Sequence, residues 1–272
     1  MPERGSVPRT RQRAAETPGP LMFVRYASPP NQRGSCGPPD SATFFQYGVT
    51  GTIDRGLREL ARQFAGAWPY LGLIAHATGI PDPLDRRVVE AYWVGNALLN
   101  RVGTGAMGRS MEDRFRRRTG LNFPKLAESV DAGGVPHHSY HVFCIYPWTG
   151  LLGDGNKAAE YALTVLDRCR IRWGRVEAVQ GDQVVVESQP LTWNGHRLDL
   201  APATTEVAVA AIDGAGLISD LQPGDRVALH WDWVCDRLTP TQLRALRQWT
   251  RYHLAIANSR LQHPGVAAAL DQ

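Results

Sequence analysis

A change in residue pattern near position 167 most strongly constrains how this chain can fold. Before it, apolar residues recur at helical spacing; after it, short β-rich runs alternate with turn dipeptides. The runs cover residues 171–179, 184–187, 190–198, 205–212 and 226–233. The third contains Asn194-Gly195, the strongest hairpin motif in the chain. Five short strands are typical of a small barrel. We therefore predict an α+β protein, with a mainly helical N-terminal domain followed by an OB-like five-stranded β-barrel and a C-terminal helix.

The expected helices and strands define three segments. Apolar periodicity predicts helices over residues 53–73, 85–99, 111–118, 156–166 and 240–257. Residues 1–21, rich in Pro, Arg, Ser and Thr, have no such periodicity and are expected to form a disordered leader. Residues 22–166 are then assigned to the helical domain and 167–272 to the barrel with its closing helix.

Charge and hydropathy exclude several classes of function. The formal net charge is +4, and the leader supplies half of it, since four arginines there outnumber two glutamates. No lysine block or basic–aromatic interleaving favours nucleic-acid binding. No apolar run approaches the roughly 18 to 20 residues of a membrane span, and no secretory core is present. We expect a cytoplasmic protein whose four cysteines (Cys36, Cys144, Cys169, Cys235) stay reduced; none forms a CxxC pair.

The β-rich segment begins and ends with motifs. Residues 169–176 read Cys-Arg-Ile-Arg-Trp-Gly-Arg-Val, and residues 181–186 place Gly-Asp before three valines. Residues 224–230 read Gly-Asp-Arg-Val-Ala-Leu-His and precede the closing helix. The order Cys-x4-Gly-x-Val, strand after Gly-Asp, hairpin, Gly-Asp-x-Val-x-x-His and helix resembles the HypC-type chaperones that help to build [NiFe]-hydrogenase active sites. The resemblance covers about one third of the chain.

The resemblance implies a metal-handling role. In HypC-type proteins the corresponding cysteine and histidine lie close together and are implicated in holding the iron fragment Fe(CN)2CO for the hydrogenase large subunit. Carried over, these are Cys169 and His230, with iron as a transient cargo and the large subunit or other maturation proteins as partners. Thiolate and imidazole ligands suit such iron. Trp173, Gly174 and Asp225, within the two motifs, are assigned to partner binding.

This chain departs from the HypC pattern at the cysteine. In that family the cysteine becomes the amino terminus, whereas Cys169 is internal and has a whole domain before it. Arg172-Trp173 also replaces the usual apolar–proline pair before the glycine. These changes weaken the transfer of mechanism but leave the fold prediction intact.

Further candidate ligands lie in the helical half. Cys36 stands among turn-forming residues, with Arg33 nearby in sequence, and is a candidate second iron ligand. His137 and His141 would share one face of a helix, or one side of an extended segment, and are candidate metal ligands in either geometry. Position 138 is a histidine, so the glutamate of a zinc-protease HExxH motif is absent.

Three functional interpretations follow. The first is an accessory protein of [NiFe]-hydrogenase maturation, which handles the iron fragment or docks the large-subunit precursor. The second is a metal-free protein–protein interaction module built on a HypC-like barrel. The third is an enzyme that uses the histidine cluster with Cys36 or Cys144, but no nucleophile, base and orienting acid occur at a recognisable spacing. We therefore expect a chaperone or carrier and not an enzyme.

Overall fold

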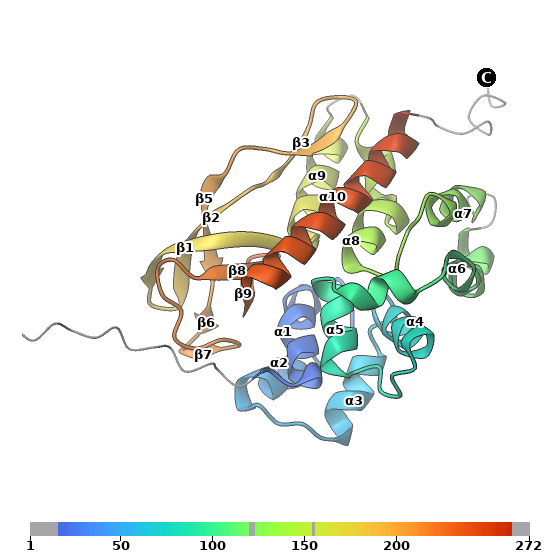
Figure 1. The fold of residues 1–272 in the computed structure, drawn as a ribbon. Coiled ribbons are helices and arrows are strands. Elements are labelled where there is room, and N and C mark those ends of the chain that lie inside the picture. Colours follow the sequence, from blue (N-terminus) through green and yellow to red (C-terminus); the bar gives the residue numbers. More distant parts are fainter. Residues whose placement is uncertain (1–15, 120–122, 154–155, 263–272) are drawn as a thin grey trace, which may run out of the picture.

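The computed structural model describes residues 16–119, 123–153 and 156–262, and helices dominate its first part (Figure 1). The leader predicted over residues 1–21 overlaps α1, which begins at Gly19 with Pro20 in its first turn. Residues 1–15 and 263–272 lie outside the described residues. The helices before the sheet are α1 (Gly19–Gln32), α2 (Ser41–Thr50), α3 (Arg55–Arg62), α4 (Trp68–Thr78), α5 (Arg86–Trp93), η1 (Ala97–Arg101), α6 (Thr104–Thr119), α7 (Phe123–Asp131), α8 (His138–Tyr140), the π-helix η3 (His141–Ile145), η4 (Pro147–Leu151) and α9 (Lys157–Cys169).

Two of the expected helices are interrupted. The helix predicted over 53–73 is divided into α3 and α4, since Gly66 precedes Pro69, and a proline in the first turn starts a new helix. Asp54 caps α3 by accepting a hydrogen bond from the Leu57 amide at 2.9 Å. The helix predicted over 85–99 ends at Trp93 and resumes as η1.

The strands are β1 (Arg172–Gln180), β2 (Gln183–Ser188), β3 (Leu191–Trp193), β4 (Leu198–Leu200), β5 (Thr204–Val209), β6 (Ala211–Ile212), β7 (Ala215–Gly216), β8 (Arg226–His230) and β9 (Trp233–Arg237). Five of them pair in the order β1-β2-β5-β9-β8, and β8 also pairs with β1. We call these five strands the ring. β5 and β9 meet at a single parallel pair, Val209 with Trp233. The α+β class, with a helical region, a five-stranded sheet and the C-terminal helix α10 (Pro240–Gln262), is confirmed.

The assignment of strands to the five-stranded ring was partly wrong. Asn194-Gly195 does turn a hairpin, but that hairpin is β3–β4, which forms a separate two-stranded sheet. The run at 226–233 is two antiparallel strands, because the chain reverses at Trp231. Trp231 has a positive φ of 52°, which is unusual for a bulky residue.

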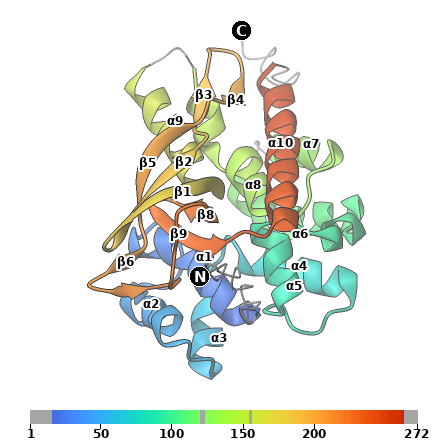
Figure 2. The ribbon, with the colours of Figure 1, turned by 60° about the vertical axis from the view of Figure 1, so that its left-hand side comes forward.

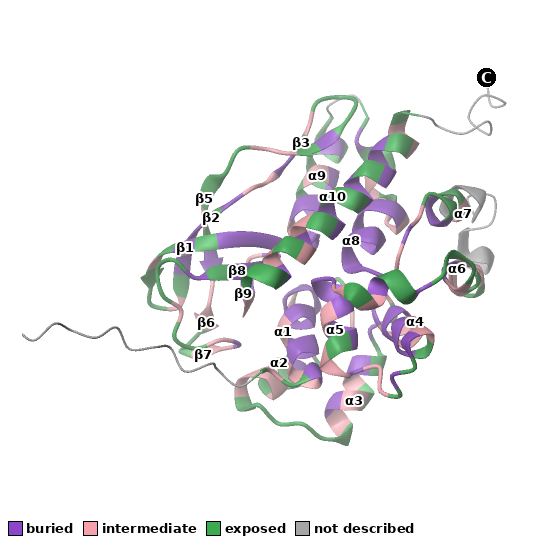
Figure 3. Ribbon diagram, in the orientation of Figure 1, coloured by how far each residue is buried: buried purple, intermediate pink, exposed green. Residues whose placement is uncertain are grey.

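The buried core is not divided at residue 167, where the sequence predicted a domain boundary. Helix α9 runs through that position and ends at Cys169. A small cluster inside the ring contains seven buried residues: Val176, Val184, Val186, Ala208, Val227, Leu229 and Val234. The larger cluster is continuous from α1 through α9 to the outer side of β8 and to α10. α10 packs against α8 and η3, and in Figure 2 α8 lies between α10 and the strands β1, β2 and β5; buried residues concentrate along this junction (Figure 3).

Candidate metal centre

Strand pairing brings the two motifs of the barrel segment together. β1 and β8 are antiparallel, with Arg172 opposite Leu229, so the start of β1 lies beside the end of β8. The amide of Trp231 donates to the carbonyl of Arg168 at 2.7 Å and extends this contact toward α9. Cys169 and His230 therefore face one site, as the sequence predicted.

A third potential ligand comes from the helical half. His138, Cys169 and His230 each offer one potential ligand atom, and these three atoms lie within 4.8 Å of one another. A tetrahedral site with ligand bonds of 2.0 to 2.3 Å needs separations of about 3.3 to 3.8 Å, so shifts of roughly 1 Å would complete it. The three residues are 5 %, 7 % and 1 % exposed, respectively. Among the described residues, this is the only group of three or more potential ligands brought together in this way.

The hydrogen bonds of His230 leave one nitrogen free. Its Nδ1 lies 2.6 Å from the carbonyl oxygen of Tyr26, to which it donates. Its Nε2 is buried and has no hydrogen-bond partner among the described residues. A ring that donates from one nitrogen to a backbone carbonyl and keeps the other lone pair free is oriented as a metal-binding histidine usually is.

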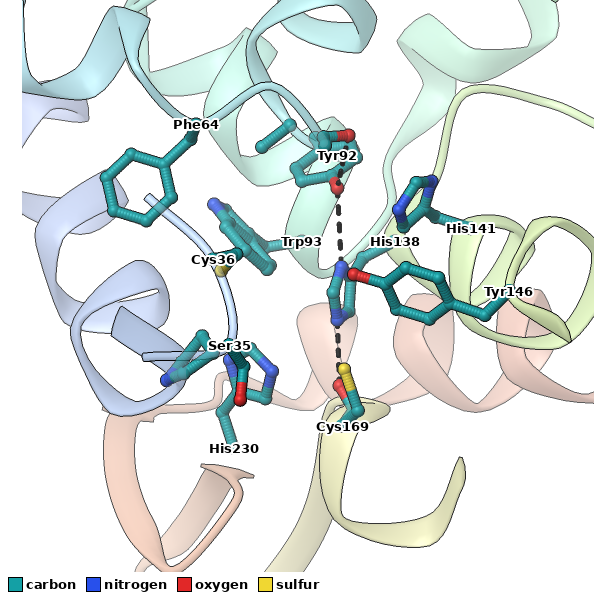
Figure 4. A pocket seen from close by; sticks show the side chains of 13 residues that line it. Ser35, Cys36, Phe64, Tyr92, Trp93, His138, His141, Tyr146, Cys169 and His230 are labelled. Carbon is teal, nitrogen blue, oxygen red and sulfur yellow. Dashed lines mark hydrogen bonds between the residues drawn. The ribbon is translucent and has the colours of Figure 1, made fainter. Parts of the chain in front are cut away.

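His138 lies between Tyr92 and Cys169 (Figure 4). Its Nε2 is 2.8 Å from the carbonyl oxygen of Cys169, and its Nδ1 is 3.3 Å from the hydroxyl of Tyr92. The Tyr92 hydroxyl has a second acceptor, the carbonyl of Gly66 at 3.5 Å. If Nε2 binds a metal, Nδ1–H can donate to Tyr92 while Tyr92 donates to Gly66. His138 can therefore change tautomer without losing every partner.

Burial sets the protonation states in the site. It lowers the pKa of His138 to about 4 and that of His230 well below its ordinary range, so both imidazoles are neutral at pH 7 and their lone pairs can bind a metal. Burial also raises the pKa of the Cys169 thiol, and that of Cys36 to about 12. Each thiol therefore keeps its proton until a metal displaces it.

The three potential ligands border a small, mostly aromatic cavity, called the metal cavity below. Its free volume is about 30 Å³, more than one water molecule needs. Trp93 packs on both imidazoles, with ring centroids 4.6 Å from His138 and 5.7 Å from His230. Tyr92, Tyr146 and Phe64 add further aromatic walls. Such apolar walls lower the local dielectric constant and so strengthen the interactions of any charge placed inside.

The other predicted metal ligands separate into two groups. Cys36 and His141 line the same cavity, and Cys36 is partly buried in the loop between α1 and α2. Neither belongs to the three-residue group. The structure does not bring His137 into the cavity: its Nδ1 bonds the Ser139 hydroxyl at 2.8 Å, and that hydroxyl also bonds Nδ1 of His253 on α10 at 2.8 Å.

His138 was missed as a ligand because its neighbours formed the expected pair. The segment is neither one regular helix nor a strand: His137 is the extended cap of α8, and His141 begins a π-helix. Counting from the cap, His138 and His141 are three residues apart and can share one helical face. Recognising His137 as a cap would have predicted that pair.

The three residues assigned to partner binding are all buried. Trp173 is 4 % and Asp225 8 % exposed. Asp225 accepts hydrogen bonds from the Arg237 guanidinium at 2.9 Å and from the Gln222 amide at 3.0 Å, which hold the end of the barrel together. A Cβ on Gly174 would lie 2.2 Å from Val186, so this glycine permits close packing inside the ring. Trp173 and Gly174 line a second pocket, described below.

Comparison with known proteins identifies a family without assigning a role. A sequence model described as a family of unknown function, DUF6390, matches residues 15–264. No curated protein and no solved structure matches the chain. In the part of the chain that the structure describes, no helix is both long and apolar enough to cross a bilayer.

Proposed function

The chain belongs to the DUF6390 family of unknown function, and we propose that it is an accessory protein of [NiFe]-hydrogenase maturation. Its cargo would be the Fe(CN)2CO fragment, held at Cys169, His230 and His138. Its partners would be the hydrogenase large-subunit precursor or other maturation proteins in the cytoplasm. The convergence of one thiol and two neutral imidazoles within 4.8 Å carries this proposal.

The donor set suits a cargo that must be released again. Thiolate and imidazole bind iron well, and three protein ligands leave positions for the fragment's own diatomic ligands. A complete cage of four protein ligands would hold the metal more permanently, as structural zinc sites do. Because the buried thiol starts protonated, loading releases a proton and unloading takes one up.

The helical half supplies part of the proposed site. The resemblance to HypC-type chaperones implied only Cys169 and His230, whereas His138 and Cys36 come from before the barrel. Cys36 is the less buried of the two thiols that line the cavity. We place it where the cargo enters and leaves. In this proposal the upstream part supplies ligands that a separate assembly factor would otherwise provide.

A metal-free interaction module is the second candidate. It is favoured by the hydrogen bonds of the site, since three of the four imidazole nitrogens of His138 and His230 already have protein partners. In that case Cys169 and His230 only pack at the junction of barrel and helices, and partner binding needs neither side chain.

The test is to purify the full chain after co-expression with the hydrogenase maturation proteins, without oxygen, and to measure iron and infrared absorption. We expect bound iron together with bands of metal-bound cyanide and carbon monoxide. Cys169→Ala and His230→Gln should each abolish these bands. Cys144→Ala is the matched control, because Cys144 is also a buried free cysteine but lies outside the cavity.

Two results would decide against the carrier. If the wild-type protein contains no iron and shows none of these bands, the proposed iron cargo is excluded. A Cys169→Ala variant that still supports partner binding and normal hydrogenase activity would establish the metal-free module instead. Thermal unfolding of each variant should accompany these measurements, so that loss of the fold is not mistaken for loss of the site.

A further inference from the structure

A second pocket lies between β1, β2 and the start of α10, and it shares no lining residue with the metal cavity. Its free volume is about 100 Å³. We call it the arginine pocket, defined by Trp173, Arg175, Arg226, Arg247 and the acid Glu187. Of these side chains, only Trp173 was assigned to partner binding from the sequence, and none of them holds the proposed iron cargo. The inference below goes beyond the hydrogenase proposal and does not depend on it.

The arginine pocket has an excess of positive charge. Arg175 is paired with Glu177 at 3.2 Å, but Arg226 and Arg247 have no ion pair among the described residues. Glu187 is the one acid in the wall and pairs with neither of them. Burial, followed by the charges of Arg226 and Arg251, lowers the pKa of Arg247. An anion bound here would relieve this repulsion.

A buried donor on one of the lining residues also lacks an acceptor. Trp173 is 4 % exposed, and its indole N–H has no hydrogen-bond partner in the described parts of the chain. The indole ring lies close to two guanidinium groups, with ring-centre distances of 5.5 Å for Arg247 and 5.7 Å for Arg170. Buried donors are nearly always paired, and an oxygen-bearing ligand at Trp173 would supply the missing acceptor.

We propose that the arginine pocket binds a carboxylate side chain of an acidic polypeptide segment from a partner protein. A carboxylate offers two oxygens, which match the planar donors of a guanidinium and can also accept from an indole N–H. Trp173 is buried among arginines and presents no open ring face on which a nucleobase could stack. The pocket therefore favours a polypeptide over a single-stranded nucleic acid.

The experiment titrates the full-length protein into a fluorescein-labelled hexaglutamate peptide and follows fluorescence anisotropy. We expect saturable binding that weakens as salt is added, and no binding of the matching hexaglutamine peptide. Arg247→Gln should raise Kd about tenfold, as expected for loss of a charged hydrogen bond. Trp173→Phe should raise Kd several-fold, because it keeps the ring and removes the donor.

Arg244→Gln is the matched control. Arg244 lies one turn earlier on α10, is exposed, and donates to Thr241 within the helix. Its Kd should stay within about twofold of wild type. Equal weakening by Arg247→Gln and Arg244→Gln would overturn the proposal, as would an oligonucleotide of equal charge that binds more tightly than the peptide. If Arg247→Gln does not fold, a shift of the Trp173 indole N–H resonance on adding peptide to wild type provides the same test, and no shift would refute it.

Discussion

His137 and His138 are adjacent in sequence, yet their side chains belong to different sites. His138 lies between Tyr92 and Cys169 in the metal cavity, whereas His137 bonds the Ser139 hydroxyl beside α10. Both are buried and uncharged at neutral pH, because burial lowers both pKa values. Chemistry alone therefore does not distinguish them; the backbone direction at the start of α8 does.

This neighbouring pair allows a controlled test of the third ligand. We expect His138→Gln to weaken cobalt(II) binding by at least tenfold, because it removes a ligand of the proposed site. His137→Gln should leave the affinity within about twofold, since that ring does not line the cavity. Anaerobic titration, followed by the absorption of the cobalt–thiolate bond, measures both. Equal loss of affinity in the two variants would exclude a specific role for His138.

The buried histidines also make stability depend on pH. Burial lowers the pKa of His253 to about 3, from an ordinary value of 6.5. Below about pH 6.5 the unfolded chain therefore binds a proton at this histidine, whereas the native protein does not. The stability that the neutral ring contributes is complete above pH 6.5 and is lost on acidification. On going from pH 7 to pH 5, each such histidine should lower the free energy of unfolding by about 2 kcal/mol.

Urea unfolding at pH 5, 6 and 7 measures this slope. His253→Asn should reduce the slope, whatever its effect on absolute stability. His76→Gln should leave it unchanged, because His76 is exposed. A free energy of unfolding that stays constant over this pH range would show that these rings are not buried in their neutral form.

At the scale of elements, the loop between α1 and α2 lines part of the metal cavity and contacts the barrel through Arg33. The Arg33 guanidinium lies 4.4 Å from the centre of the Trp231 ring and pairs with Asp232 at 3.1 Å. Both partners lie in the β8–β9 turn, directly after His230. Within the loop, Gly37 has φ of 89° and approaches Phe64 so closely that a Cβ would lie 2.4 Å away.

Removing this attachment should loosen the loop and expose the Cys36 thiol. A stacked cation and an exposed ion pair together contribute about 1 kcal/mol, which corresponds to roughly a fivefold change in an opening equilibrium. Arg33→Ala should therefore speed the alkylation of Cys36 by iodoacetamide about fivefold, as measured by mass spectrometry. Arg55→Ala, which removes another exposed ion pair on α3, should not change the rate. An unchanged rate in Arg33→Ala would mean that the loop is held by its internal contacts alone, such as the hydrogen bond from Asn31 to the Cys36 carbonyl at 2.9 Å.

At the scale of the whole molecule, the helical part and the barrel share their principal core. The ring encloses only the seven-residue cluster, whereas the outer side of β8 and the helix α10 pack into the cluster that begins at α1. Tyr26 of α1 also accepts the hydrogen bond that orients His230. The barrel segment therefore depends on the helices both for burial and for the geometry of its ligand.

We expect residues 167–272, produced alone, to lack a cooperative thermal transition and to bind cobalt(II) only weakly. Separation would expose the apolar surface of α10 and remove His138 from the site. Circular dichroism and the cobalt titration measure the two effects. A fragment starting at residue 157, which restores all of α9, is the control for a badly chosen boundary. A stable fragment that binds cobalt(II) as the full chain does would show that the ligands of the barrel are sufficient.

The sequence alone determined those features that depend on local pattern and on strand pairing. Apolar periodicity and turn dipeptides predicted the α+β class, and the motifs at the two ends of the barrel segment predicted that Cys169 and His230 meet. Antiparallel pairing of β1 with β8 is the physical reason for the second success.

Tertiary structure decided what periodicity cannot encode. It placed the Asn194-Gly195 hairpin outside the ring, carried α9 across the expected boundary, and selected His138 over His137. Each outcome depends on which surfaces pack together far along the chain, since burying a shared core determines where a side chain points. A pattern of single residues specifies that a surface is apolar but does not specify the surface that covers it.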